Sequence, residues 1–171
     1  RKKTAGRKKK WLTLPGFTGR KKRCMESLPP FPMNAAEKPR AIRPRSAAAG
    51  AVTPQDLYRT MVTIRAFEEH LAEGFRNGEI PSEAIHLSIG QEAVAAGVCL
   101  NLRHSDYINT THRGHGHTIA KGGNVQAMMC ELFGRASGTN GGKGGSMHIA
   151  DFSVGMLGAN GVVAAGIPIA V

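Results

Sequence analysis

The chain has 171 residues, of which 41% are hydrophobic and 5% aromatic, with 22 glycines and 3 cysteines. These values suit one globular domain and exclude collagen-like and disulfide-dense proteins. The net charge of +11 is unevenly spread: residues 1–50 hold 15 Lys or Arg and 2 Asp or Glu, whereas residues 51–171 hold 8 and 10. The high isoelectric point therefore does not indicate a basic nucleic-acid-binding face on residues 51–171.

Residues 1–50 contain two basic clusters, a proline-rich stretch and an Ala/Gly stretch, without apolar periodicity. This composition predicts a disordered basic leader. Three interpretations stay open. Translation could start at Met33, the leader could target a mitochondrion or plastid, or it could be a tail that binds nucleic acid or a membrane surface.

The chain has an odd number of cysteines, and none of them form a C-x-x-C pair. They are Cys24, Cys99 and Cys130. They support neither a disulfide framework nor a zinc knuckle, and they favour a reducing compartment. The longest apolar run, within Gly161–Val171, is far shorter than the ~20 residues of a membrane-spanning helix. We therefore expect a cytoplasmic protein, or a mitochondrial or plastid one if the leader is a targeting segment.

The first predicted element after the leader is a helix. Thr53 suits the N-cap, Pro54 the first helical position and Asp56 the positive end of the helix dipole. Gly78 then ends the helix. Its apolar residues recur at helical spacing and predict a core-facing stripe. They are Leu57, Met61, Ile64, Leu71 and Phe75.

Further along the chain, the pattern predicts a helix over Gln91–Leu102 and a strand over Asp106–Thr110. A histidine-rich loop is expected over Thr111–Lys121, followed by a helix from the N-cap Asn124 through Phe133. Residues 134–161 are rich in glycine and predict an ordered loop with buried apolar anchors. Loops of this length in compact domains are usually functional or disordered, and the apolar residues Met147, Ile149, Phe152 and Met156 favour an ordered loop.

The glycines do not match either common phosphate-loop template. A P-loop ending at Lys143 would need glycine at position 137 and Ser or Thr at position 144, where the chain has Ser137 and Gly144. The dinucleotide template fails because Met147 replaces its third glycine. Two interpretations remain: a backbone whose N–H groups approach an anion beside Lys143, or an irregular loop that needs positive φ.

His112, His115 and His117 form an H-x-x-H-x-H pattern. No neighbouring carboxylate or cysteine completes a metal shell, and Arg113 would repel a cation, so an anion site is the better hypothesis. His86 lies between two apolar residues, which favours a structural histidine. Its intrinsic pKa leaves an acid–base role open.

Six ordered blocks resemble the alpha subunit of thiamine-diphosphate-dependent 2-oxo acid and acetoin dehydrogenases. The details around Thr111–Arg113 and Gly155–Gly161 look most like the acetoin-cleaving branch or nearby bacterial pyruvate members. The resemblance covers about Leu57–Val171. Its blocks are Leu57–Phe75, His86–Ala93, Thr111–Gly116, Leu132–Gly134, Gly141–His148 and Gly158–Val163.

The resemblance implies an α/β thiamine-diphosphate-binding fold with a mostly parallel sheet flanked by helices, of which residues 51–171 are the N-terminal part. It implies an oxidoreductase that cleaves acetoin or oxidatively decarboxylates pyruvate or other 2-oxo acids. The acyl or acetaldehyde unit would pass to a lipoyl carrier on a transferase core. A beta subunit is the expected partner in a heterotetramer, and the alternative is a non-catalytic module with a nucleic-acid-binding tail.

By the same resemblance, His112 and Arg113 contact the cofactor's diphosphate, and main-chain groups at Gly161 and Val163 hold its aminopyrimidine ring. His86 faces the substrate channel and is the catalytic candidate. No metal ligand is assigned, because the family's Gly-Asp-Gly magnesium motif would lie beyond Val171. The chain is thus expected to be a C-terminally truncated fragment that is inactive alone.

Overall fold

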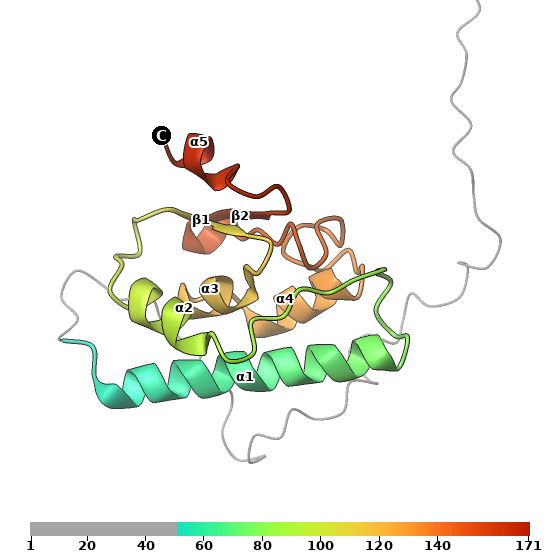
Figure 1. Cartoon of the computed structure of the whole chain (residues 1–171), viewed down its shortest axis with the longest axis horizontal. Coiled ribbons are helices and arrows are strands. Elements are labelled where there is room, and N and C mark those ends of the chain that lie inside the picture. The colour runs from blue at the N-terminus through green and yellow to red at the C-terminus, as the bar shows by residue number, and fades with distance from the viewer. Residues whose placement is uncertain (1–50) are drawn as a thin grey trace, which may run out of the picture. The chain divides into compact units, whose positions relative to one another are not determined.

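The computed structural model describes residues 51–171 (Figure 1). The basic leader and Met33 lie outside the described residues, so their three interpretations stay predictions. The described part contains helices and a small parallel sheet, which confirms the expected α/β class. Among these residues, no helix has the length and apolar character needed to cross a membrane.

Helix α1 (Pro54–Arg76) begins where the sequence predicts. The Thr53 hydroxyl accepts the backbone N–H of Asp56 at 3.2 Å, and the Asp56 carboxylate accepts the N–H of Thr53 at 3.1 Å. This reciprocal capping box satisfies two of the donors that a helix start leaves unpaired. Asn77 caps the other end, and Gly78 follows at φ +69°, in the left-handed region that glycine adopts without a Cβ penalty.

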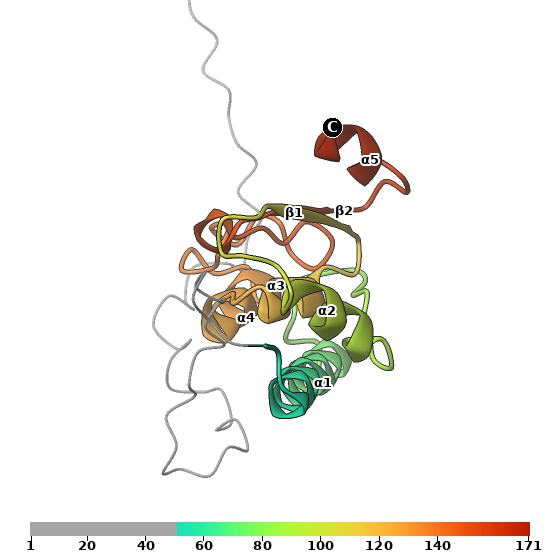
Figure 2. The same cartoon turned by 90° about the vertical axis from the view of Figure 1, so that its left-hand side faces the viewer.

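The core lies on one face of α1. Ile64 and Leu71 from the predicted stripe are fully buried, and Phe67, which the stripe did not include, is buried between them. Figures 1 and 2 show α1 as one layer, with α2 (Glu92–Cys99), α3 (His115–Ala120) and α4 (Val125–Leu132) as the next layer beneath the sheet. Ile119 from α3 and Met128 from α4 fill the same core.

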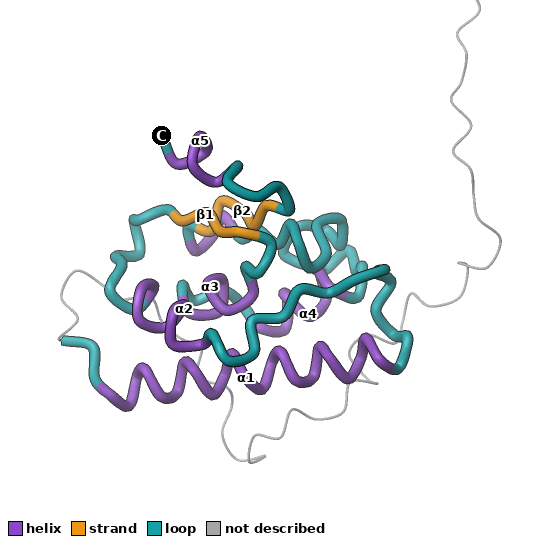
Figure 3. Tube along the Cα trace, viewed as in Figure 1, coloured by secondary structure: helices purple, strands orange, loops and turns teal. Residues whose placement is uncertain are grey.

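The sheet has two parallel strands, β1 (Ile108–Thr111) and β2 (Met156–Asn160). Their carboxyl ends are level, because Thr111 pairs with Asn160. Strand β1 lies close to its predicted position. Strand β2 lies in the segment predicted to be a loop, after the short 3-10 helix η1 (Phe152–Val154), as Figure 3 shows. That expectation was wrong because the two buried residues of β2, Met156 and Ala159, are three positions apart, so the segment lacks the alternating apolar pattern that identifies a strand in sequence.

A second correction concerns the histidine-rich segment. It was expected to be a loop, but α3 begins at His115 and buries His115, Thr118 and Ile119. A short buried helix with polar residues on its inner face lacks the apolar period that identifies a helix in sequence. The final helix α5 (Gly166–Ala170) has no buried residue.

Candidate active site at the carboxyl ends of the strands

The predicted site residues gather at one edge of the sheet. His112 and Arg113 follow β1 directly, and Gly161 follows β2 directly. Because the strands are parallel and Thr111 pairs with Asn160, both segments leave the sheet at the same edge. Ligands of α/β proteins bind outside the carboxyl ends of parallel strands. Tertiary structure thus supplies a common location for residues about 50 positions apart in sequence.

His86 reaches this edge from the connector between α1 and α2. Its ring packs edge-on against the ring of His112, with centroids 4.9 Å apart and planes at 84°. The Nδ1 atom of His86 is buried and has no hydrogen-bond partner among residues 51–171. A buried polar atom without a partner is costly in a fold, which is consistent with a group that is completed by a ligand.

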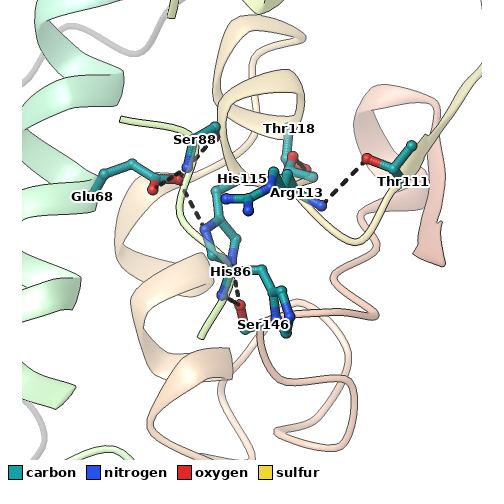
Figure 4. A network of polar contacts seen from close by, with 9 residues as sticks. Glu68, His86, Ser88, Thr111, Arg113, His115, Thr118 and Ser146 are labelled. Atoms are coloured by element: carbon teal, nitrogen blue, oxygen red, sulfur yellow. Dashed lines mark hydrogen bonds and ion pairs between the residues drawn. The ribbon is translucent and has the colours of Figure 1, made fainter. Parts of the chain in front are cut away.

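Arg113 presents an unpaired cation at the same edge (Figure 4). The backbone N–H of this half-buried residue donates to the hydroxyl of Thr111 at 3.5 Å, while its guanidinium forms no ion pair with any of residues 51–171. A guanidinium offers five donors in a planar fork that suits phosphate oxygens.

The segment after β2 offers main chain rather than side chains. The N–H of Val162 donates a hydrogen bond to the side-chain oxygen of Asn160 at 2.8 Å. A Cβ built on Gly161 would lie 3.4 Å from the Cε1 atom of His148, so the backbone there is closely approached by that ring. Val163 is 82% exposed, and no ring contact or hydrogen bond described for residues 51–171 joins it to His112 or Arg113.

The sequence did not reveal a buried polar chain beneath the site. Nδ1 of His115 lies 3.0 Å from Oε1 of Glu68, and Nε2 of His115 lies 3.1 Å from the hydroxyl of Ser146. The Ser146 hydroxyl in turn accepts the backbone N–H of His86 at 3.2 Å. Figure 4 shows these side chains in one line leading to His86. Nothing in the local sequence around His115 predicts that its partner is a carboxylate 47 residues away.

These contacts correct the expectation that all three imidazoles of the H-x-x-H-x-H pattern face an anion. Both ring nitrogens of His115 are engaged inside the protein. Burial lowers the pKa of His117, which opposes a cationic role, although a hydrogen bond with the backbone of Arg113 acts in the other direction. Only His112 remains beside Arg113 at the edge. Among residues 51–171, no cluster of three or more His, Cys, Asp or Glu could hold a metal ion.

The glycine-rich loop does approach an anion, but the anion belongs to the protein. The buried Glu131 carboxylate of α4 accepts four backbone N–H groups, at 2.7 to 3.3 Å. Burial by itself would raise the pKa of Glu131, but these four donors outweigh it and hold the pKa below its usual value. The donors are Asn140, Gly142, Gly144 and Gly145. Both interpretations of the loop therefore hold in part: its N–H groups surround an anion, and Gly142 and Gly145 adopt positive φ.

A parallel α/β unit with an unpaired Arg, two histidines and accessible main chain at its strand ends is typical of an enzyme domain that binds an anionic cofactor. The chain belongs to the Dehydrogenase E1 component family, whose model matches residues 59–171. Membership implies thiamine diphosphate as the cofactor and does not support the alternative of a nucleic-acid-binding module.

Relatives of the chain include alpha subunits of an acetoin oxidoreductase and of the pyruvate dehydrogenase E1 component. The alpha subunit of acetoin:2,6-dichlorophenolindophenol oxidoreductase from Bacillus subtilis is 54% identical over 114 residues, which are 67% of this chain and 34% of that protein. The Cupriavidus necator protein of the same name is 53% identical over 66% of this chain and 34% of that protein. The alpha subunit of the pyruvate dehydrogenase E1 component from Zymomonas mobilis is 44% identical over 67% of this chain and 32% of that protein. The chain spans about one third of the length of these relatives.

Proposed function

We propose that this chain is part of the alpha subunit of a thiamine-diphosphate-dependent dehydrogenase that cleaves acetoin or oxidatively decarboxylates pyruvate or a related 2-oxo acid. Residues 51–171 would contribute to the cofactor-binding domain. The observation that carries the proposal is the unpaired guanidinium of Arg113 beside His112, at the carboxyl ends of β1 and β2. The higher identity to the acetoin enzymes favours acetoin among the substrates.

The residues at this edge fit the parts of thiamine diphosphate. Arg113 and His112 would bind the diphosphate by charge-assisted hydrogen bonds. Main-chain groups at Gly161 and Val163 would hold the aminopyrimidine ring. When bound, the cofactor supplies an electron sink for carbon–carbon bond cleavage.

His86 would work on the substrate side. Its unpartnered Nδ1 atom could hold or transfer a proton at the substrate, and its contact with His112 keeps it beside the cofactor position. This role would complement the diphosphate contacts rather than duplicate them. His86 is the catalytic residue of the proposal, and the other four residues bind the cofactor.

The remaining parts of the enzyme would come from elsewhere. We propose a beta subunit as the partner in a heterotetramer and a lipoyl group on a transferase core as the acceptor of the acyl or acetaldehyde unit. The Mg²⁺ that accompanies the diphosphate would be held by residues outside this sequence. The cysteine content favours a reducing compartment, so we propose the cytoplasm, or a mitochondrion or plastid if residues 1–50 are a targeting leader.

The test is the Arg113→Ala variant of the complete subunit, co-expressed with its beta subunit. Loss of charge-assisted hydrogen bonds of roughly 1.5–3 kcal/mol should weaken cofactor binding about 10- to 150-fold. Isothermal titration calorimetry with thiamine diphosphate and Mg²⁺ measures the change. Arg103→Ala removes an exposed arginine before β1 and serves as the control.

Unchanged cofactor affinity in Arg113→Ala would contradict the proposed cofactor site. An equal loss in Arg103→Ala would show that general charge, rather than the position of Arg113, governs binding. Turnover of the unaltered enzyme with acetoin and with pyruvate then distinguishes the two substrates.

A further inference from the structure

The buried chain of Glu68, His115 and Ser146 has the order of a serine hydrolase triad but not its accessibility. His115 and Glu68 are fully buried, and Ser146 is 4% exposed. The Ser146 hydroxyl also accepts the N–H of His86. A substrate carbonyl has no route to this hydroxyl, so the chain does not act as a nucleophilic triad.

The protons in the chain can be placed from its hydrogen bonds. The carboxylate of Glu68 accepts, so Nδ1 of His115 carries a proton and donates to it. The Ser146 hydroxyl receives the N–H of His86 and donates its own proton to Nε2 of His115. With the hydrogens assigned in this way, each donor along the chain meets an acceptor.

The same chain holds the His86 segment at a second point. Oε2 of Glu68 accepts the backbone N–H of Ser88 at 2.8 Å, two residues beyond His86. One buried unit thus fixes two backbone N–H groups that flank the His86 side chain. Nδ1 of the His86 ring has no hydrogen-bond partner among residues 51–171, and the ring packs edge-on against that of His112. Its position therefore depends on how firmly its backbone is held.

We propose that Glu68, His115 and Ser146 form a positioning unit for His86. The unit aims the His86 ring at the cofactor position beside His112 and affects turnover only through that ring. This inference rests on the proposed function, because it takes His86 as the catalytic group. A displacement of about 1 Å in a reacting group is enough to lower a rate strongly.

The experiment is a double-mutant cycle in the complete subunit paired with its beta subunit. Ser146→Ala removes the acceptor for the His86 N–H and should lower kcat about tenfold, the equivalent of one hydrogen bond. KM and the affinity for thiamine diphosphate should stay unchanged. In the His86→Ala background, Ser146→Ala should cause no further loss of kcat, because residues that act as a unit are not additive.

Glu68→Gln tests the far end of the chain, because an amide cannot accept hydrogen bonds from both His115 and Ser88 as a carboxylate does. It should show the same dependence on His86. Thr118→Val is the matched control: it removes another buried hydroxyl, which donates to the carbonyl of Gly114 at 2.9 Å and does not contact His86. Its effect on kcat should be the same with and without His86.

Ser146→Cys keeps a weak donor and acceptor at the same place and should retain more turnover than Ser146→Ala. If the alanine variant does not yield a folded subunit pair, Ser146→Cys replaces it in the double-mutant cycle with His86→Ala. Additive losses from Ser146 and His86 substitutions overturn the positioning unit while leaving the proposed function intact. Normal turnover in His86→Ala alone overturns the role of His86 and the positioning unit together.

Discussion

The ring of His86 stands edge-on to the ring of His112, with 4.9 Å between their centroids. His86 precedes α2 and His112 follows β1, so this contact joins two segments that the chain separates by a whole helix and a strand. It links the histidine expected on the substrate side to the histidine expected on the diphosphate side. Under the proposed function, the two rings mark the point where substrate and cofactor would meet.

The first prediction concerns His86 itself. His86→Ala in the complete subunit pair should lower kcat by about 10²- to 10⁴-fold, the usual contribution of a positioned acid–base group. Affinity for thiamine diphosphate should change little, because the proposed diphosphate ligands His112 and Arg113 are unaltered. Steady-state kinetics with acetoin and pyruvate measure the effect, and His104→Ala, an exposed histidine, is the control. Normal turnover on both substrates would show that His86 is only structural.

The second prediction concerns the anion cradle in the glycine-rich loop. Glu131→Ala leaves four backbone N–H groups without an acceptor and should destabilise the protein by about 3 kcal/mol or more. Acetate should restore part of the lost melting temperature by occupying the vacated cradle, whereas chloride at equal ionic strength should restore less. Glu73→Ala, an exposed residue of α1, should respond to neither salt. Equal effects of acetate on both variants would exclude a specific cradle.

The third prediction concerns pH. Glu92 on α2 accepts from Nε of Arg65 at 2.6 Å, and this hydrogen bond, with help from the N–H of Gly90, lowers the pKa of Glu92 to about 2 although burial opposes it. A carboxyl with a lowered pKa stabilises the fold above its unfolded pKa of about 4.3, and this stability is lost as pH falls toward 2.

Glu92→Gln should therefore cost about 1–2 kcal/mol at pH 7, a range that allows for the solvent around Arg65. The difference from the unaltered protein should shrink at pH 3. Thermal melts of both proteins at the two pH values measure it, and Glu69→Gln, whose carboxylate lies 3.9 Å from Arg65 on the surface, is the control. A difference that does not shrink at pH 3 would show that the ionised carboxylate is not what stabilises the fold.

The fourth prediction concerns the backbone strain at Ala164. Its φ is +66°, in the left-handed region that costs a Cβ-bearing residue about 1 kcal/mol. Ala164→Gly should relieve this strain and slow amide hydrogen exchange at Ile167, whose N–H donates to the Ala164 carbonyl at 3.0 Å. Ala165→Gly, at φ −63°, should speed exchange instead. The same direction of change in both variants would contradict a strain at Ala164.

Local chemistry made several elements predictable from the sequence. Thr53 and Asn124 are N-caps because each side chain accepts a backbone N–H three residues ahead, and both helix starts agree with the structure. Gly78 follows the end of α1 at positive φ for the same kind of local reason. The ordered motifs also predicted the family, since they depend on residue identity and order rather than on contacts.

Tertiary structure alone decided what those residues touch. The sequence did not decide between the two interpretations of the glycine-rich loop, because nothing local identifies Glu131 as the acceptor of its N–H groups. It likewise gave no sign that His115 would turn inward, since its partners Glu68 and Ser146 are 47 and 31 residues away. Hydrogen bonds between distant segments depend on how the layers stack, and a lone buried carboxylate leaves no periodic pattern along the chain. Only the packing of α1, α3 and the glycine-rich loop brings these groups together beneath His86.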